Sequence, residues 1–412
     1  MIKLAIDKPA IDKLIKTSII VLIIAILPIT PIYLSNASSQ TIRVIVGIDP
    51  NELTLHRNSL RLFGYIASEI PELGAVVMEM PIYVVDNVKK IPYVKYVEID
   101  YEVKIYGEVQ WNIEMINATY VWNSYSSYGD AVYGYGATIR VAVVDTGIDY
   151  KHKDLQNAVE WCIVSLNNGK TFYRGYSLDK CKDLNGHGTH VAGIIAARLN
   201  GFGVAGAAPK TILYAVRVLS ASGSGYVSDV AKGIIEATKG PDNQPGTDDD
   251  ADVISMSLGG PDSQTLYNAV SYAYNYSVTL VAAAGNEGAS TPSCPACYSE
   301  VIAVGAIDQS YNAPNWSNRK PDIVAPGVDI LSTWPKNRYA YASGTSMACP
   351  HVSATVALMQ ALRLAASKPK LTPNEIKGIL TSTAIDLGDN GYDDVYGYGL
   401  VDAYRAVEEA LN

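Results

Sequence analysis

Ser346 lies in the segment SGTSMACPH, 343–351, where small residues surround a hydroxyl just before a long apolar run. One interpretation is structural, because a serine at a helix N-cap can accept a hydrogen bond from the first turn. Pro350 is compatible with such a first turn. The other interpretation is chemical: a serine nucleophile needs open space, since a substrate carbonyl must come within bonding distance. The strip 344–348 is free of bulky side chains and would provide that space.

Three more polar residues lie within two positions of a glycine at the boundaries of expected elements. Asp145 closes the apolar segment IRVAVVD, His187 lies in NGHGTHVAG, and Asn286 lies in AAAGNEG. A carboxylate at the end of a buried strand is costly unless it is hydrogen-bonded or paired. His187 and His190 form an HxxH pair, but no glutamate completes an HExxH pattern, so a metal site is not expected there. Four such residues in one chain are hard to explain by helix capping alone.

The elements that must position these residues alternate between strands and helices. Near-continuously apolar strands are predicted at 139–145, 211–219, 252–258, 278–285 and 300–307, and helices at 190–199, 226–240, 267–277 and 351–366. Strands that are apolar throughout are typical of a parallel sheet covered on both faces, so the fold class is α/β. In such sheets ligands bind at the carboxyl ends of the strands. Asp145 and Asn286 follow two of these strands.

Length and composition describe a globular chain of two or three domains. The chain has 412 residues, of which 48% are hydrophobic and 18% charged, so it can bury a large core. A net charge of −9 argues against a nucleic-acid partner. Residues 41–106 form a small α+β domain in this interpretation, with strands at 41–48, 74–80 and 93–103 and a helix at 57–70.

The first 37 residues have the features of a targeting segment. Two lysines precede the apolar stretch 17–34, and small residues follow it, an order typical of a signal peptide. A retained membrane anchor is the alternative, although two prolines interrupt the stretch and it is short for a span of roughly 20 residues. We therefore expect a secreted protein and leave attachment to the cell surface open.

Export agrees with the cysteines, because disulfides persist in oxidising compartments. Cys162 and Cys181 flank an apparent loop and could close it. Cys294 and Cys297, in CPAC, could be a tight disulfide, a redox pair or half of a metal site, and no second CxxC completes a zinc site. Cys349 is expected to be a small buried hydrophobe.

An acidic insertion spans residues 240–252. Its aspartates at positions 248, 249, 250 and 252 could chelate calcium. A solvated acidic loop is the favoured interpretation, because the spacing matches no EF-hand.

The segments VVDTGID, NGHGTHVAG, AAGNEG and SGTSMACPH, in that order, closely resemble those of the subtilisin-like serine proteases. The order Asp, His, Ser is the one that subtilisin shows. The resemblance covers residues 107–412 and implies a parallel seven-stranded sheet with helices on both faces. Residues 38–106 resemble the inhibitory propeptide of the family, a small α+β domain.

The resemblance implies a role for each of the four polar residues. Ser346 would attack the peptide carbonyl, and His187 would take its proton, since an imidazole with a pKa near 6.5 can accept and return protons around neutrality. Asp145 would hold the imidazole in the right tautomer. Asn286 would donate its amide to the oxyanion, together with the backbone N–H of Ser346.

The resemblance also implies a cleft for an extended peptide. Two strand segments would flank the peptide and pair with its backbone, which implies broad specificity because such bonds ignore side chains. A spacious apolar pocket would favour large apolar or aromatic residues before the scissile bond. The cleft residues would be Gly223, Ser224, Gly225, Tyr226, Leu258, Gly259 and Gly260, and those of the pocket Ala283, Ala284, Gly285 and Glu287, with Leu258–Gly260 as a shared wall.

A structural Ca²⁺ site is the cofactor that the resemblance implies. Its ligands would be the side chains of Asp154 and Asn200 and the carbonyl oxygens of Arg198, Phe202 and Val204, since calcium prefers oxygen ligands. The family's further ligand from the mature N-terminus has no clear counterpart in this chain.

The function expected is that of a secreted, calcium-stabilised serine endopeptidase made as a proenzyme. It would act as a monomer on proteins and peptides, cleave itself after Tyr106 and be inhibited by its own propeptide. Two alternatives stay open: a catalytically silent binding protein with the same fold, and a dedicated maturation protease tethered to a membrane.

Overall fold

The structure is a computed structural model that describes residues 41–100, 109–134 and 139–412. The chain divides into two compact units, Met1–Val103 and Lys104–Asn412. The expected targeting segment 1–37 and the expected cleavage point after Tyr106 lie outside the described residues. Within the described ranges, no helix combines the length and the apolar character that crossing a membrane requires.

The first unit is an antiparallel sheet with helices, as expected of a small α+β domain. Its strand order is β2-β3-β1-β4, and every pairing is antiparallel. Its valines and methionines form a core of their own, with Val46, Met78 and Met80 fully buried. The elements are β1 (Thr41–Gly47), α2 (Leu53–Leu60), β2 (Tyr65–Ile70), β3 (Ala75–Pro81), α3 (Val85–Val88) and β4 (Tyr96–Ile99).

The helix predicted over residues 57–70 is wrong in its second half. The helix α2 ends at Leu60, and residues 65–70 form the edge strand β2 paired with β3. Gly64 lies between the two elements. A Cβ atom at Gly64 would collide with the backbone of Glu79, so the chain turns onto the sheet at the point where glycine allows close approach.

The second unit contains a sheet of eight strands in the order β12-β11-β10-β9-β5-β8-β6-β7. Seven neighbouring strands are parallel, which confirms the predicted α/β sheet, and β7 adds an antiparallel edge beside β6. The strands are β5 (Arg140–Asp145), β6 (Val159–Leu166), β7 (Thr171–Gly175), β8 (Ile212–Arg217), β9 (Val253–Met256), β10 (Thr279–Ala283), β11 (Val301–Ile307) and β12 (Ile323–Pro326).

The stretch between Cys162 and Cys181, expected as a loop, contains strand β7. Residues 171–175 alternate little in polarity, and none of them is buried, so their pattern gives no strand signal. They become a strand because the edge of β6 offers unpaired backbone groups, from Cys162 to Leu166.

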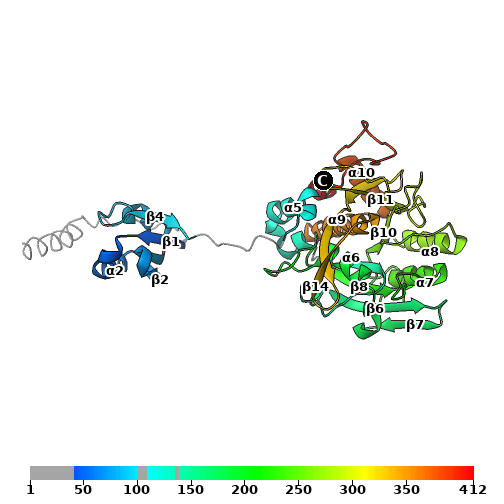
Figure 1. Cartoon of the computed structure of the whole chain (residues 1–412), viewed down its shortest axis with the longest axis horizontal. Helices are drawn as coiled ribbons and strands as arrows, with labels where there is room; N and C mark the ends of the chain where they lie inside the picture. Colours follow the sequence, from blue (N-terminus) through cyan, green and yellow to red (C-terminus); the bar gives the residue numbers. More distant parts are fainter. Residues whose placement is uncertain (1–40, 101–108, 135–138) are drawn as a thin grey trace, which may run out of the picture. The chain divides into compact units, whose positions relative to one another are not determined.

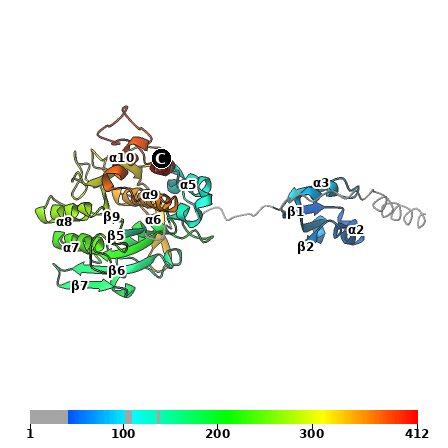
Figure 2. The same ribbon diagram turned by 180° about the vertical axis from the view of Figure 1, so that it is seen from behind.

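Helices cover both faces of this sheet (Figures 1 and 2). On one face Val141 and Val143 of β5 pack with α6 (His187–Ala196) and α9 (Thr345–Ala365). On the other face Ala142 and Val144 pack with α7 (Val227–Thr238) and α8 (Gln264–Asn275). Successive side chains of a strand point to opposite faces, so one apolar strand serves two cores.

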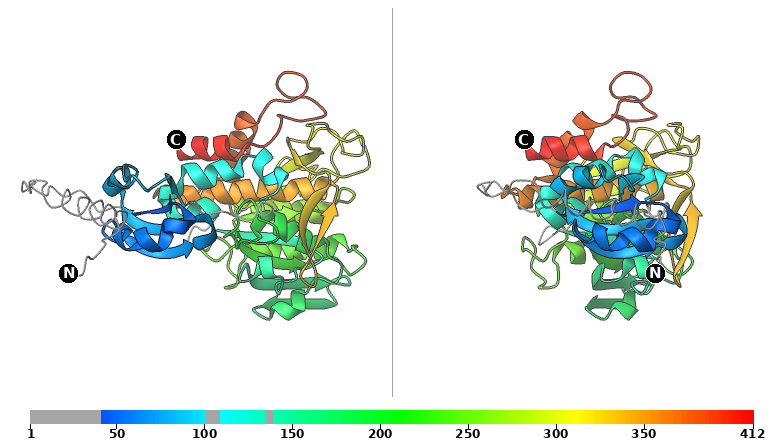
Figure 3. Two further views of the ribbon diagram at one scale, coloured as in Figure 1. Left: turned by 60° about the vertical axis from the view of Figure 1, so that its left-hand side comes forward. Right: turned by 90° about the vertical axis from the view of Figure 1, so that its left-hand side faces the viewer.

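The long helix α9, orange in Figure 3, is buried along most of its length. It begins at Thr345, beside the serine considered as its N-cap, and therefore contains Ser346 and Pro350 ahead of the predicted apolar run. The hairpin of β13 (Ile330–Trp334) and β14 (Arg338–Ala342) precedes it. The remaining helices of this unit are α4 (Trp111–Met115), α5 (Ala118–Ser124), α10 (Pro373–Thr383) and α11 (Ala403–Leu411).

Candidate active site

Asp145 and His187 form a direct pair at the carboxyl edge of the sheet. Asp145 is the last residue of β5 and is fully buried, while His187 is the first residue of α6 and keeps 30% of its side chain exposed. The His187 Nδ1 atom lies 2.8 Å from Oδ1 and 2.9 Å from Oδ2 of Asp145. A carboxylate accepts only, so Nδ1 carries the proton and Nε2 remains an acceptor.

A second buried carboxylate, Asp183, holds the turn that leads into His187. Its oxygens accept hydrogen bonds from the Thr146 hydroxyl and from the backbone N–H groups of Asn185, Gly186 and Thr189. Thr146 in turn accepts the N–H of Gly188 at 3.0 Å. These bonds tie the end of β5 to the start of α6, so the imidazole is presented to Asp145 in one orientation.

The electrostatics of His187 follow from these two carboxylates. Burial opposes the charged imidazolium, but the charge and hydrogen bond of Asp145, with the charge of Asp183, raise the His187 pKa above its ordinary value of 6.5. The imidazole is therefore a stronger base than a free histidine. The nearby thiol of Cys349 is buried, which raises its pKa to about 11, so it stays protonated.

Ser346 lies in the first turn of α9 and exchanges hydrogen bonds with Ser257, just after β9. The Ser346 hydroxyl donates to the Ser257 carbonyl at 3.2 Å, and the Ser257 hydroxyl donates to the Ser346 carbonyl at 2.8 Å. Among the described residues, the Ser346 hydroxyl makes no hydrogen bond to His187. Catalytic hydrogen bonds are often absent or long in a substrate-free site and form only in the complex.

Asn286 follows β10 and is held by Thr345, the residue before Ser346. Its Oδ1 accepts the N–H of Thr345 at 2.8 Å and the Thr345 hydroxyl at 3.0 Å. The same hydroxyl accepts the N–H of Gly285 at 3.1 Å. Since the carbonyl of the Asn286 amide is occupied, its NH₂ group is the part left to donate to a ligand.

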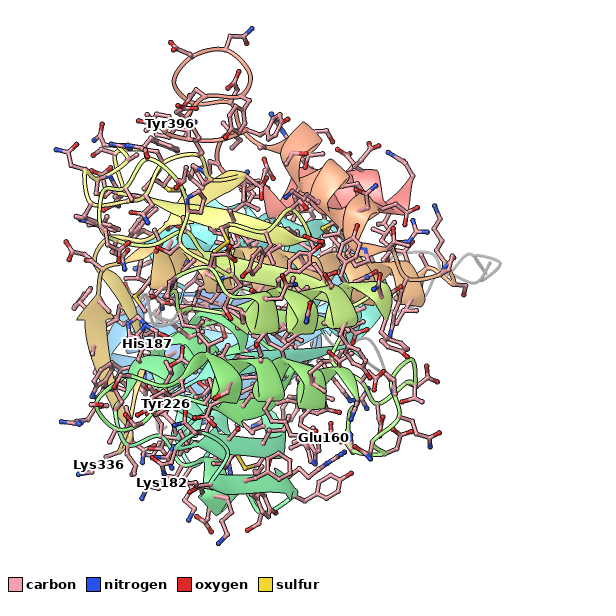
Figure 4. The ribbon with its side chains drawn as sticks, turned by 90° about the vertical axis from the view of Figure 1, so that its right-hand side faces the viewer. Glu160, Lys182, His187, Tyr226, Lys336 and Tyr396 are labelled. Atoms are coloured by element: carbon pink, nitrogen blue, oxygen red, sulfur yellow. A yellow bond between two sulfur atoms is a disulfide. The ribbon has the colours of Figure 1, made fainter. Side chains whose placement is uncertain are left out.

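A cleft of about 420 Å³ runs beside His187. The seven residues expected to flank a bound peptide all line it: Gly223, Ser224, Gly225, Tyr226, Leu258, Gly259 and Gly260. His187 and Tyr226 lie on the same side of the domain in Figure 4. The two backbone segments therefore line one cleft together with His187, and the segment 258–260 also lines the smaller pocket beside Ser346.

A smaller pocket of about 150 Å³ adjoins Ser346. Ala283, Gly285 and Glu287 line it, together with Asn286 and Ser293. The Glu287 carboxylate is anchored, because Oε2 accepts the Asn318 amide at 2.9 Å and the Asn286 N–H at 3.0 Å. Ala284, also expected here, is fully buried and lines neither cavity; its carbonyl instead accepts the N–H of Ser293 at 2.9 Å.

A short segment closed by a disulfide follows Ser293 of this pocket, and its first cysteine, Cys294, lines the larger cleft. Cys294 pairs with Gly260 through two backbone hydrogen bonds of 2.8 and 3.0 Å, and it is bonded to Cys297. A second disulfide joins Cys162 and Cys181, and Cys349 is a buried free thiol. Of the alternatives open for CPAC, the structure contains the tight disulfide.

The residues expected to bind calcium gather around Asp154. The carboxylate of Asp154 is fully buried and accepts hydrogen bonds from Asn200 at 3.2 Å, from the N–H of Val204 at 3.0 Å and from Tyr339 at 2.8 Å. No Lys or Arg within the described ranges forms an ion pair with it. A buried carboxylate without a cationic partner fits a cation site, because burying an unpaired charge is costly.

The remaining two expected ligands lie on the same loop as Asn200. The N–H of Phe202 donates to the Asn200 Oδ1 atom at 3.4 Å. The backbone N–H of Arg198 donates to the Asp154 carbonyl at 2.7 Å. The loop and the carboxylate are therefore adjacent, as the sequence interpretation requires.

The acidic insertion holds its charges in two different ways. Asp242, Asp249 and Asp250 lie close enough to share a cation, while Asp252 pairs with Lys370 at 2.6 Å and accepts the N–H of Arg140 at 2.8 Å. Burial raises the pKa of Asp250 to about 6. Asp252 therefore anchors the sheet and is not part of a solvated loop.

Four supporting residues went unassigned in the sequence interpretation: Thr146, Asp183, Ser257 and Thr345. Asp183 had a recognisable signal, since an aspartate four residues before a helix start can form an Asx turn with the residue two positions on. Ser257 had none, because its role depends on a carbonyl that is distant in sequence.

The α/β fold and the side chains gathered at its sheet edge are those of a serine hydrolase. Residues 136–399 match the subtilase family. The chain is 42% identical over 280 residues to subtilisin DY of Bacillus licheniformis, which covers 66% of this chain and 92% of that protein. It is 38% identical over 375 residues to the thermostable alkaline protease of Halalkalibacterium halodurans, which covers 90% of this chain and 94% of that protein. It is 39% identical over 331 residues to the intracellular serine protease of Paenibacillus polymyxa, which covers 78% of this chain and 93% of that protein.

The chain belongs to the subtilase family and is a subtilisin-type serine endopeptidase that acts on proteins.

Proposed function

We propose that this endopeptidase works through a triad of Ser346, His187 and Asp145, with Asn286 in the oxyanion hole. The observation that carries the proposal is the Asp145–His187 pair, with 2.8 Å between carboxylate and Nδ1, at the edge where α9 and β10 present Ser346 and Asn286. Such a pair sets the imidazole tautomer that a serine nucleophile requires.

In the first step His187 Nε2 takes the proton of the Ser346 hydroxyl as Oγ bonds to the substrate carbonyl carbon. The carbonyl electron pair moves to oxygen, which accepts hydrogen bonds from the Asn286 amide and the Ser346 N–H. That N–H belongs to the first turn of α9 and has no acceptor within the helix. His187 then gives the proton to the departing amine as the C–N bond breaks, and water repeats the sequence on the acyl-enzyme.

We propose broad specificity with a preference for large apolar or aromatic residues before the scissile bond. The cleft walls are backbone-rich, with Gly223, Gly225, Gly259 and Gly260 lining the cavity, and backbone pairing ignores side chains. Profiling a peptide library checks this directly: a requirement for paired basic residues would contradict it.

We further propose that the protein is exported and made as a self-processing proenzyme, with the first unit as its inhibitory propeptide. Export is supported by the apolar stretch 17–34 after two lysines and by two disulfides in the second unit. The alignment with the thermostable alkaline protease covers 90% of the chain, so it extends well beyond the second unit.

A structural calcium ion is proposed at Asp154. The side chains of Asp154 and Asn200 and the carbonyl oxygens of Arg198, Phe202 and Val204 would hold it. The ion would neutralise the buried Asp154 carboxylate and fix the loop that follows α6.

One experiment tests both the triad and self-processing. Residues 38–412 are expressed as wild type, as Ser346→Ala and as Ser343→Ala, a neighbouring serine whose hydroxyl contacts Asp329. Wild type and Ser343→Ala should process themselves and react with a fluorophosphonate probe, while Ser346→Ala should do neither. Equal processing or labelling of Ser346→Ala would overturn the proposal.

A further inference from the structure

A second groove, of about 440 Å³, shares one lining residue with the substrate cleft. That residue is Asn185, two positions before His187. Its amide donates to the carbonyl of Ala221 at 3.0 Å, and its Oδ1 accepts the N–H of His187 at 3.1 Å. The second groove and the substrate cleft are therefore neighbours that meet at Asn185.

The groove is lined by four cationic side chains: Lys151, Lys182, Lys336 and Arg338. All four are exposed. Lys151 pairs with Asp179 at 3.3 Å, but none of the other three has a carboxylate within ion-pair distance among the described residues. Figure 4 places Lys182 and Lys336 on the same side of the domain as His187. Three cations without an ion-pair partner among the described residues gather here, in a protein whose net charge is −9; the Arg338 Nε group donates to the Pro335 carbonyl at 3.1 Å.

Two of the three carboxylates that line the groove are buried and engaged by backbone donors. Asp149 accepts the N–H of Lys336 at 2.8 Å, and Asp183 accepts the three N–H groups at the start of α6. These carboxylates fix the walls and reduce the positive potential but do not cover the ammonium groups. Only Asp179 is an exposed carboxylate of the groove, and Lys151 and Tyr150 already contact it.

The walls of the groove are held in place before any ligand arrives. Asp149 ties the turn between β13 and β14 to the end of β5, and Lys153 donates its N–H to Asn337 at 2.9 Å. Trp334 packs against Gly186, where a Cβ atom would collide with its ring. The cations of the turn and of the 182–185 segment are thus mounted on a rigid frame, which limits the ordering cost of binding.

We propose that this basic groove is an extended subsite that binds acidic stretches of polypeptide substrates. Unpaired lysine and arginine groups attract carboxylates over about 10 Å at moderate salt. A local positive site on an acidic protein raises the local concentration of acidic segments that the net charge would otherwise repel. The groove would thereby add selectivity for acidic substrates to a cleft that binds mainly the backbone of the substrate.

The test compares peptides that share one cleavable core and carry either glutamates or glutamines at one end, placed before or after the scissile bond. At low ionic strength, kcat/KM for a glutamate peptide should exceed that for its glutamine partner. The double variant Lys182→Glu/Lys336→Glu should lower that ratio by about 3- to 10-fold. Fluorescence anisotropy of labelled hexaglutamate and hexaglutamine should show the same preference without cleavage.

Lys239→Glu is the control for the single variants Lys182→Glu and Lys336→Glu, each of which should also lower the ratio. Lys239 follows the carboxyl end of the 12-residue helix α7, roughly 18 Å from the end at the cleft, so the same single charge reversal there should leave the ratio unaltered. Equal ratios for glutamate and glutamine peptides at both ends, or an equal loss in the control, would overturn the proposal. Failure to cleave any peptide would instead count against the proposed triad. Binding of hexaglutamate would still test whether the groove holds acidic peptides.

Discussion

Ser257 and Ser346 exchange hydroxyl-to-carbonyl hydrogen bonds across the gap between β9 and α9. The reason lies in Pro350, four residues after Ser346. In an α-helix the N–H of residue 350 would bond to the carbonyl of residue 346, but proline has no N–H. The Ser257 hydroxyl takes the place of that missing donor at 2.8 Å. Ser257 is therefore a positioning residue for the first turn of α9.

Replacing Ser257 by alanine should lower kcat more than it raises KM. The change leaves the Ser346 carbonyl without a donor, and an unpaired buried acceptor costs about 1–3 kcal/mol. A looser first turn displaces the nucleophile, so we expect kcat to fall by about 3- to 10-fold. Steady-state kinetics with thermal unfolding measure both effects.

Ser255→Ala is the control for this prediction. Ser255 lies on β9 and bonds to Ser353, not to Ser346. It should cost stability without a matching loss of kcat. If both variants lose kcat in proportion to stability, Ser257 has only a structural role.

Thr345 should act on catalysis through Asn286. Asn286→Ala removes the proposed oxyanion donor and should lower kcat by about 10²–10³-fold, the magnitude found for the equivalent amide in subtilisin. Thr345→Val removes one of the two bonds that orient this amide and should cause a smaller loss. In Asn286→Ala the further change Thr345→Val should have little effect on kcat. Additive losses in the double variant would contradict this coupling.

The pH dependence of activity should reflect the raised pKa of His187. Only the neutral imidazole can accept the Ser346 proton, so kcat/KM should rise with pH through an apparent pKa above 6.5. Asp145→Asn removes the charge that raises this pKa. The rise of kcat/KM should therefore shift to lower pH, and kcat should fall by about 10⁴-fold. An acidic limb that does not move in Asp145→Asn would contradict the assignment.

The raised pKa of His187 affects the stability of the fold in the opposite direction from activity as the pH rises. A pKa raised in the folded state means that the Asp145–His187 pair stabilises the fold fully below pH 6.5. That contribution is lost as the pH rises through the raised pKa. The protein should thus gain activity and lose this share of stability over the same pH range.

Removing the Cys294–Cys297 disulfide should weaken substrate binding in the cleft that Cys294 lines. The variant Cys294→Ser/Cys297→Ser leaves the backbone pairing with Gly260 but frees the wall, so KM should rise while kcat changes little. The loss of stability should be about 2 kcal/mol at most, because the closed loop is short. Dithiothreitol should raise KM in wild type and have no further effect in the variant; an equal rise in both would place the effect elsewhere.

Calcium removal should lower the unfolding temperature through Asp154. A ligand present at 100 times its Kd adds about 2.7 kcal/mol to stability, and chelation with EDTA should remove that contribution. Asp154→Asn should lower the unfolding temperature in calcium and make it insensitive to EDTA. Asp248→Asn, in the acidic insertion, is the control and should keep the response to calcium. An EDTA response that survives Asp154→Asn would place the ion elsewhere.

The strands whose sequences are apolar throughout were predictable, and those at the edges were not. β5, β9 and β10 are buried on both faces, so their composition alone identifies them. The edge strands β2 and β7 are exposed or half-buried throughout, and a neighbouring strand supplies the hydrogen bonds that define them. Ser346 as a possible N-cap and Pro350 in the first turn placed the start of α9 close to Ser346, and the structure starts it at Thr345.

The sequence by itself predicted the fold class and the four polar residues at the proposed site, because each lies within two residues of a glycine at the boundary of an apolar element, in a segment that resembles the family's. Only the tertiary structure decided how they are held: Thr345 orients Asn286, Ser257 supplies a donor for Ser346, and four cations meet in one groove. The physical reason is that burial and local conformation produce a periodic pattern of apolar and polar residues along a strand or helix. A hydrogen bond or a shared electrostatic potential between segments some 90 residues apart, such as those of Ser257 and Ser346, produces no pattern in the neighbouring sequence.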